Sequence, residues 1–171
     1  AISACVKSGA NRLDLGKRTK EAMDFAYEHD YSSSLELRFT GVCAARRQPP
    51  LLPAEVKRLL ETEKQFTNSS DTDVVADLYR RFFETVAAAA TTLTFRALDW
   101  GDGEAEQLAQ ALPRFTALTM LDLSNNKLSS VGAKVITEAV QSGTAVLKSI
   151  NLRCNNLGTE GWCAIFHALR D

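Results

Sequence analysis

The feature that most constrains this chain is an eleven-residue pattern that occurs twice in its C-terminal part. The first copy, residues 118–128, reads LTMLDLSNNKL, and the second, residues 147–157, reads LKSINLRCNNL. The helical patterns that follow the two copies have the same spacing along the chain, so that Ile136 aligns with Ile165. Units of this length stack because each one buries only part of a core by itself. The sequence therefore predicts an array of repeats.

The residue types in each copy have a physical reason. Alternating leucines such as Leu121 and Leu123 place one face of a short strand in a core shared with neighbouring units. Asn126 and Asn155 fall at the turn, where an amide can satisfy backbone groups that a tight coil leaves unpaired. Residues between the inward leucines point to the other face of the strands, namely Thr94, Arg96, Asp122, Ser124, Asn151 and Arg153. That row is either a polar recognition surface or simply the soluble face of the strands.

The pattern LxxLxLxxNxL, followed by a GAxxLxxAL-like helix, resembles the leucine-rich repeat. The distance along the chain between matched positions is similar to the repeat length of the ribonuclease-inhibitor-like subclass. The resemblance is clear for about residues 115–171. It implies an α/β solenoid with short parallel strands on a concave face, helices on a convex face, and a protein partner bound to the concave face.

A worn third unit precedes the two clear ones. Leu93 and Phe95 take the strand positions and Trp100 takes the last leucine position, while Leu98 stands where asparagine is expected. We therefore expect this turn to differ from the others. The predicted repeat domain spans residues 91–171, with units near 93–114, 115–143 and 144–171.

Residues 1–90 allow two interpretations, degenerate repeats or a helical N-terminal cap. In the first, strands lie at residues 13–15, at Leu35–Leu37 and near residues 64–67. Apolar periodicity predicts helices at about 19–28, 53–66 and 75–86 in either case. The fold class is thus α/β, with a more irregular helical first half.

Charge and hydropathy limit the class of partner. Twenty basic and twenty-one acidic side chains give a net charge of −1, balanced on both sides of residue 90. Binding to nucleic acid or to a membrane surface needs a basic excess, so neither is expected. No apolar run is long enough for a transmembrane helix. The expected partners are proteins, within a larger complex.

No set of residues suggests catalysis. The two histidines, His29 and His167, stand apart from any catalytic motif, and residues 101–104 lack the alternating oxygen ligands of a calcium loop. The four cysteines show no metal-ligand spacing, and they are Cys5, Cys43, Cys154 and Cys163. We therefore expect no enzyme activity, no metal and no cofactor. Free thiols fit a reducing intracellular compartment, either cytoplasmic or organellar.

The last predicted helix carries two aromatic residues, Trp162 and Phe166, with no polar closing unit after them. Terminal units of repeat arrays show half a core to water unless they are capped. Three alternatives stay open: the protein continues past this end, another subunit covers it, or the tryptophan packs back on its own unit. The sequence favours a non-enzymatic interaction scaffold, and the alternative is a structural accessory subunit buried permanently in a large assembly, such as an organellar one.

Overall fold

The computed structural model describes residues 32–63, 69–143 and 147–168. The strands expected at residues 13–15 and 64–67 and the helix expected at 19–28 lie outside this part. The described elements, in chain order, are α3 (Ser32–Arg46), α4 (Pro53–Glu63), α5 (Ser69–Ala89), β1 (Thr92–Thr94), α6 (Asp102–Ala111), the 3-10 helix η1 (Leu112–Arg114), β2 (Met120–Asp122), α7 (Ser130–Gly143), β3 (Ser149–Asn151) and α8 (Gly158–Ala168).

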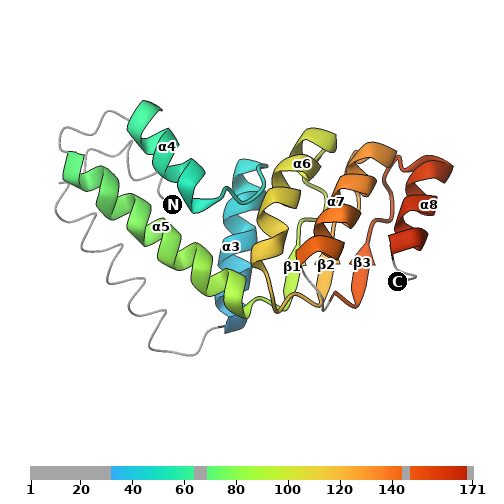
Figure 1. Cartoon of the computed structure of the whole chain (residues 1–171), viewed down its shortest axis with the longest axis horizontal. Coiled ribbons are helices and arrows are strands. Elements are labelled where there is room, and N and C mark those ends of the chain that lie inside the picture. Colours follow the sequence, from blue (N-terminus) through green and yellow to red (C-terminus); the bar gives the residue numbers. More distant parts are fainter. Residues whose placement is uncertain (1–31, 64–68, 144–146, 169–171) are drawn as a thin grey trace.

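Three successive strand–turn–helix units make up the C-terminal part, and each strand is followed by one helix of the layer α6, α7 and α8 (Figure 1). The strands form one parallel sheet in the order β1-β2-β3. Thr92 pairs with Met120, and Met120 pairs with Ser149, so each strand pairs with the strand one repeat further along the chain. The sheet and helices fit an α/β leucine-rich-repeat fold, and the register agrees with the predicted repeat spacing.

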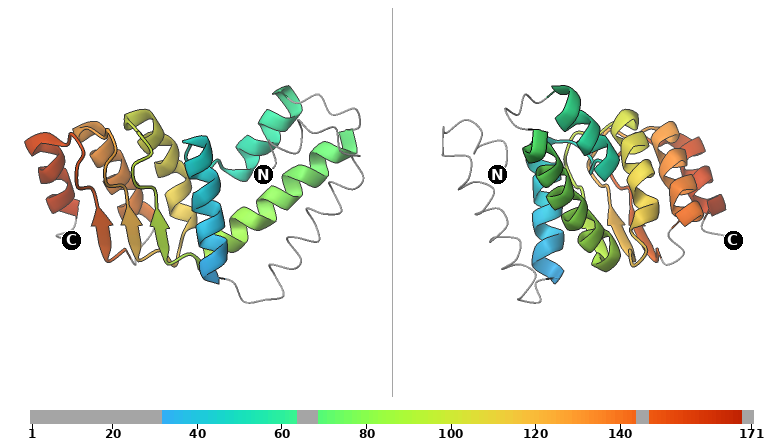
Figure 2. Two further views of the ribbon diagram at one scale, coloured as in Figure 1. Left: turned by 180° about the vertical axis from the view of Figure 1, so that it is seen from behind. Right: turned by 60° about the vertical axis from the view of Figure 1, so that its left-hand side comes forward.

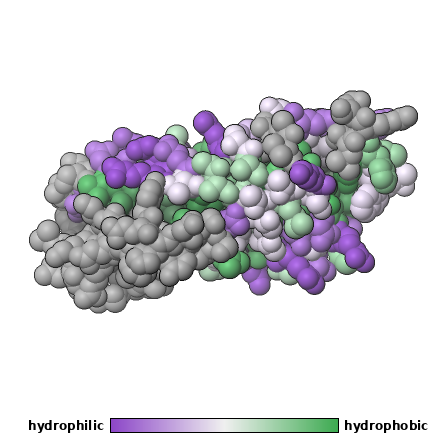
Figure 3. Space-filling view, turned by 90° about the horizontal axis from the view of Figure 1, so that it is seen from below, coloured by the Kyte–Doolittle hydropathy of each residue, from purple (hydrophilic) through white to green (hydrophobic). Residues whose placement is uncertain are grey.

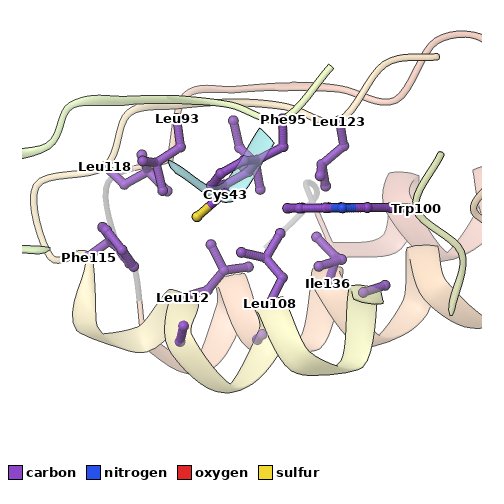
Figure 4. Packing of buried hydrophobic residues seen from close by; sticks show 14 of the residues in the cluster. Cys43, Leu93, Phe95, Trp100, Leu108, Leu112, Phe115, Leu118, Leu123 and Ile136 are labelled. Carbon is purple, nitrogen blue, oxygen red and sulfur yellow. The ribbon is translucent and has the colours of Figure 1, made fainter. Parts of the chain in front are cut away.

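The core lies between the sheet and the helices. Leu93 and Leu121 on the strands and Leu108 and Ile136 on the helices are all fully buried. In Figure 4 the side chains from the strands and those from the helices point toward one another, with the Trp100 ring between the two layers. The buried cluster is continuous from Phe39 on α3 to Ile165 on α8.

The predicted strand at Leu35–Leu37 is wrong, because these residues belong to helix α3. Phe39 and Cys43 are buried and Leu35 is partly buried, which is the four-residue spacing of a helix face. Leu37, which the strand assignment placed in the core, has 71% of its surface exposed. Two leucines separated by one residue had matched the strand pattern, but the apolar residues that follow continue with the helical period.

The other two helices predicted in the described first half are present. Helix α4 covers the described part of the segment expected at 53–66, and α5 extends beyond the predicted 75–86 at both ends. The predicted pair between Asp77 and Arg81 forms, with a carboxylate oxygen 2.8 Å from the guanidinium. A hydrogen bond from Arg80 is the main reason that the pKa of Asp77 is lowered.

The turns after the strands share a left-handed residue in all three units. Ala97, Asn125 and Cys154 each have φ of 57°. The first turn also differs from the other two, as expected, because Asp99 has φ of 66° and its equivalents, Lys127 and Asn156, do not have positive φ. Asparagine tolerates this region better than other side chains that carry a Cβ, because its short amide can bond locally.

An aromatic cluster joins the first-half helices to the units. The Phe39 ring lies 5.9 to 6.0 Å, between centroids, from the rings of Phe82, Phe83 and Phe115. The Trp100 indole also donates a hydrogen bond of 3.0 Å to the carbonyl of Arg47. Figure 2 shows α3 beside β1 at this end of the sheet, with α5 reaching it from α4. One side of the three-unit array is therefore covered by helices.

Close helix packing depends on two glycines at the repeat spacing. A Cβ at Gly132 would lie 2.5 Å from Oδ1 of Asp102 and 3.2 Å from Cβ of Ala105. A Cβ at Gly161 would lie 3.1 Å from Cα of Ser130. Glycine at these two positions lets α7 approach α6 and α8 approach α7.

Asp102 explains the residue pattern at 101–104. Its carboxylate accepts hydrogen bonds from the N–H and hydroxyl of Ser129 and from the N–H of Gly132, at the start of α7. Burial alone would raise the pKa of Asp102, but these hydrogen bonds outweigh it and lower the pKa. Anionic groups are favoured at helix N-termini. This acid therefore caps the helix of the following unit.

We expect Gly132→Ala to lower the free energy of unfolding by about 1–3 kcal/mol, because the added methyl group overpacks the contact with Asp102 and Ala105. Gly103→Ala is the matched control, since a Cβ there meets nothing within 4 Å. Its better helix propensity should leave stability unchanged or raise it by up to about 1 kcal/mol. Urea unfolding of both variants measures the difference. Equal effects would contradict the close approach of α6 and α7.

Candidate interaction surfaces

The sheet face away from the helices carries two rows of side chains that run across the strands. We call this surface, together with the Arg96 and Arg153 side chains beside it, the open sheet face. Paired residues form the rows Thr92, Met120 and Ser149, then Thr94, Asp122 and Asn151. Figure 3 shows the molecule from below, where hydrophilic and hydrophobic residues are interspersed on that side. The rows lie on adjacent strands and are held in fixed register.

The structure places five of the six predicted contact residues at accessible positions. Thr94, Arg96 and Arg153 are exposed, and Asp122 and Asn151 are half-buried. Oδ1 of Asp122 accepts the N–H of Ser124 at 2.8 Å, and Oδ1 of Asn151 accepts the N–H of Arg153 at 3.2 Å. These bonds fix the two side chains in equivalent orientations.

Ser124 requires a correction. Its exposed fraction is only 3%, so this residue is not available to a partner on the open sheet face. Strand alternation predicted an outward position, but the serine side chain is short, whereas the arginines at the equivalent positions, Arg96 and Arg153, are long enough to be exposed. Ser124 is therefore not one of the contact residues of the open sheet face.

Met120 was missed by the sequence reasoning, although 46% of its surface is exposed. It lies between Thr92 and Ser149 in the first row. The signal was present in the sequence, because the residue before Leu121 must point to the same side as the residue after it. Met120 gives the open sheet face a flexible apolar contact at the centre of the polar rows.

Two guanidinium groups flank this face. Arg96 and Arg153 occupy equivalent positions two strands apart, a separation of about 10 Å from the usual spacing of strands. Neither forms a salt bridge with an acid in the described part of the chain. By contrast, Lys127 pairs with Asp99 at 2.8 Å, and the hydrogen bond from Lys127 lowers the pKa of Asp99. The two arginines remain available to anionic groups.

Asn126 holds the turns of two units together. Its Oδ1 accepts the N–H groups of Leu98 and Trp100 at 3.0 and 3.1 Å. Its Nδ2 donates to the carbonyls of Phe95 and Leu123 at 2.8 and 2.9 Å. The side chain is buried, so these four groups have little access to water.

Asn155 repeats this arrangement with fewer partners. Its Nδ2 donates to the carbonyls of Leu123 and Leu152, and its Oδ1 accepts the N–H of Leu128 at 3.0 Å. It is half-buried, whereas Asn126 is buried. Each asparagine thus bonds to the turn of the unit before its own, and the turns form a connected series.

Trp162 and Phe166 lie on α8, and 44% and 66% of their surfaces are exposed. Their ring centroids are 6.3 Å apart, so the two rings form one apolar patch. Trp162 is therefore not buried against its own unit. The sequence indicated both residues from their position on the last helix.

The described residues show little that could support chemistry. They contain no group of three His, Cys, Asp or Glu side chains that could hold a metal. His167 is exposed on α8, and His29 lies outside the described part. A hollow of about 230 Å³ is lined by Pro50, Leu51, Leu52, Glu55, Gln107 and Gln110, and Glu55 is the one ionisable residue in this lining. Among the described helices, none has the length and apolar character to cross a membrane.

Comparison with known families gives one match. A family model described as Leucine Rich repeat matches residues 116–136 and 145–165, which start within the second and third units. The chain therefore contains leucine-rich repeats, and domains of this kind typically mediate protein–protein interactions. A comparison with curated proteins finds no match.

Proposed function

We propose that this chain is a non-enzymatic protein-interaction module that binds its partner on the open sheet face. The observation that carries the proposal is the pair of cross-strand rows with Met120 at their centre, flanked by two arginines that form no salt bridge with a described residue. Exposed apolar, hydrogen-bonding and guanidinium groups on one rigid sheet are the components of a protein contact.

The sheet and its turns are held before binding. Hydrogen bonds of Asn126 and Asn155 link each turn to its neighbour, and the strands are fixed by the parallel ladder. A surface that is already ordered loses less conformational entropy when a partner binds. This favours a binding role that needs no special chemistry.

The finer architecture that we propose is a solenoid of the ribonuclease-inhibitor-like subclass, with the open sheet face on the concave side. Three observations support it. The paired strands have a nearly constant spacing along the chain, each unit has one helix, and each turn has a residue with left-handed backbone conformation. In this proposal the chain acts as a scaffold, and the helices of the first half cover one end of the array.

The open sheet face suggests the chemistry of the partner. Arg96 and Arg153 would pair with two carboxylates about 10 Å apart, and an apolar side chain would lie on Met120. Threonine, asparagine and serine in the rows supply further hydrogen-bond donors and acceptors. The proposed partner is therefore a protein surface with an acidic rim around an apolar contact.

Charge reversal at the two arginines tests this function. After the partner has been identified by co-purification from the native source, Arg96→Glu with Arg153→Glu should weaken its affinity by tenfold or more. Arg114→Glu is the matched control, because Arg114 is exposed on η1, outside the open sheet face. Titration calorimetry gives the affinities, and thermal unfolding shows that both proteins are folded. Unchanged affinity of the double variant would exclude the open sheet face as the contact.

The exposed aromatic residues favour a second candidate, a structural accessory subunit within a large assembly. Trp162 and Phe166 would then be buried permanently. A monodisperse, folded, isolated chain supports the interaction module, whereas aggregation that only co-purified neighbours relieve supports the accessory subunit. For either candidate we propose a reducing intracellular compartment, supported by free thiols at Cys43, Cys154 and Cys163. The Cys43 side chain packs in the core, and its burial raises the pKa of the thiol to about 12.

A further inference from the structure

A third row of side chains lies beyond the two rows of the open sheet face. It continues the same parallel ladder, because the N–H of Ala97 donates to the carbonyl of Ser124 at 3.0 Å and the N–H of Asn125 donates to the carbonyl of Arg153 at 2.9 Å. Strand alternation turns the three side chains of this row toward the same side as the first two rows. In order across the units, the row consists of Arg96, Ser124 and Arg153.

The side chains of this row are long at both ends and short in the middle. Arg96 and Arg153 are exposed, whereas only 3% of the Ser124 surface is exposed. Since adjacent strands lie about 4.8 Å apart, the backbones of the two arginines are separated by about 10 Å. No side chain of comparable length stands between them in the row. We call Arg96 and Arg153, with the short Ser124 between them, the arginine pair.

The charges around the arginine pair do not neutralise it. Neither guanidinium group forms a salt bridge with a described residue. The acid in the adjacent row is Asp122, and its Oδ1 already accepts the N–H of Ser124 at 2.8 Å. Further along the turn, Asp99 is paired with Lys127 at 2.8 Å. Two positive charges therefore face the same side of the sheet at a separation that the strand ladder fixes.

A phosphate monoester matches this arrangement better than a carboxylate does. A carboxylate carries one negative charge, and a single guanidinium group commonly binds both of its oxygens. A phosphate monoester carries about −1.5 to −2 charges at neutral pH and has three strong acceptor oxygens. Charge-assisted hydrogen bonds of about 2.8 Å on two sides of one phosphate group span most of the separation of about 10 Å between the arginines. One phosphate group can thus bind both guanidinium groups.

We infer that the arginine pair binds one phosphorylated side chain of the partner protein, with one guanidinium group on each side of the phosphate. The inference rests on the proposed function and narrows it, because a single phosphate group takes the place of two separate carboxylates. Phosphorylation of the partner then raises its affinity for the open sheet face. Ser124 contributes only by its small size, which leaves the phosphate room between the arginines.

Blocked phosphoserine, acetylated at its amino end and amidated at its carboxyl end, is the first probe. It is titrated into the isotopically labelled full chain, and NMR follows the side-chain N–H signals of Arg96 and Arg153. We expect both signals to shift saturably and with one common affinity. Blocked aspartate, which offers a single carboxylate, should bind at least about fivefold more weakly.

Three variants separate the geometry of the site from its charge. Arg96→Gln and Arg153→Gln should each weaken phosphoserine binding about tenfold, because each removes one side of the contact. Ser124→Leu should weaken binding by a similar factor, although it leaves the charge unchanged. A long side chain is compatible with this position, since the equivalent positions carry arginine. Arg114→Gln on η1 is the matched control and should bind as the natural chain does.

The co-purified partner provides the second measurement. Phosphatase treatment of the partner should lower its affinity for the chain by at least about fivefold. In the Arg96→Gln/Arg153→Gln double variant, treated and untreated partner should bind equally. Titration calorimetry gives the four affinities, and thermal unfolding shows that the variant chain is folded.

Other results would overturn the inference. Phosphoserine binding that depends on one arginine only, or that Ser124→Leu leaves unchanged, would exclude a phosphate group held between the two. Inorganic phosphate that binds more tightly than blocked phosphoserine would identify a free anion as the ligand instead. Weaker partner binding after charge reversal of both arginines, with no effect of the phosphatase, would exclude the inference and leave the proposed function standing.

Discussion

The Asn126→Ala variant is expected to lose about 3 kcal/mol of unfolding free energy, a large effect for one polar side chain. The N–H groups of Leu98 and Trp100 and the carbonyls of Phe95 and Leu123 all bond to this amide. Alanine removes these hydrogen bonds and leaves buried backbone groups unsatisfied. Each unsatisfied group costs about 1–3 kcal/mol, and water that enters the site would reduce this cost. Urea unfolding measures the loss.

Asn155→Ala is the matched variant, with an expected loss of about 1–2 kcal/mol. Asn155 accepts one backbone N–H rather than two, and it is half-buried. The order of the two losses is therefore the diagnostic result. An Asn126→Ala protein as stable as the natural one would mean that the turn is not held by this amide.

Phe39→Ala is the second change with a large expected effect, a loss of about 3–5 kcal/mol. The Phe39 side chain is buried among Phe82, Phe83 and Phe115, so its removal leaves a cavity where α3, α5 and η1 meet. Leu37→Ala is the control on the same helix, because Leu37 is 71% exposed and should change stability by less than about 0.5 kcal/mol.

This pair of variants also distinguishes helix from strand. Residues 37 and 39 share one face of a strand, but they lie about 200° apart around a helix. Urea unfolding with similar losses for Phe39→Ala and Leu37→Ala would contradict the helical assignment of α3. A large loss for Phe39→Ala alone supports the helix and its contact with the units.

The second and third units could be predicted because their pattern is local and occurs twice. The spacing of Leu121, Leu123 and Asn126 defines a strand and a turn without knowledge of distant contacts. The same repeat spacing, extended to the preceding unit, predicted that Leu93 and Trp100 are core residues, and both are buried. Repetition supplied what a single sequence normally lacks, a second example of the same structure.

The first half could not be assigned in the same way. Extending the repeat to Leu35 and Leu37 matched two positions by chance, while Phe39 and Cys43 continued a helical face. The helices at 53–63 and 69–89 were predictable because their apolar periodicity is longer and less ambiguous. Whether residues 1–90 form a separate domain stays a prediction.

Some candidate-site features depend on contacts that local patterns do not encode. Asp102 reaches the N–H groups of Ser129 and Gly132, and Trp100 donates to the carbonyl of Arg47, 53 residues away. Ser124 is buried by the turn in spite of its outward position in the pattern. Met120, in contrast, was predictable, since alternation alone places it beside Asp122 on the open face.

A photo-crosslinking residue at position 120 tests the central claim, that a protein binds the open sheet face. It replaces Met120, which is half exposed there, and a matched variant carries it at Val131, which is exposed on α7. Our account predicts that position 120 crosslinks to the co-purifying partner within the native complex and that position 131 does not. An excess of the free, unlabelled Arg96→Glu/Arg153→Glu chain should not reduce the crosslinking, because this variant binds the partner weakly. Crosslinking from position 131 with none from position 120 would contradict it.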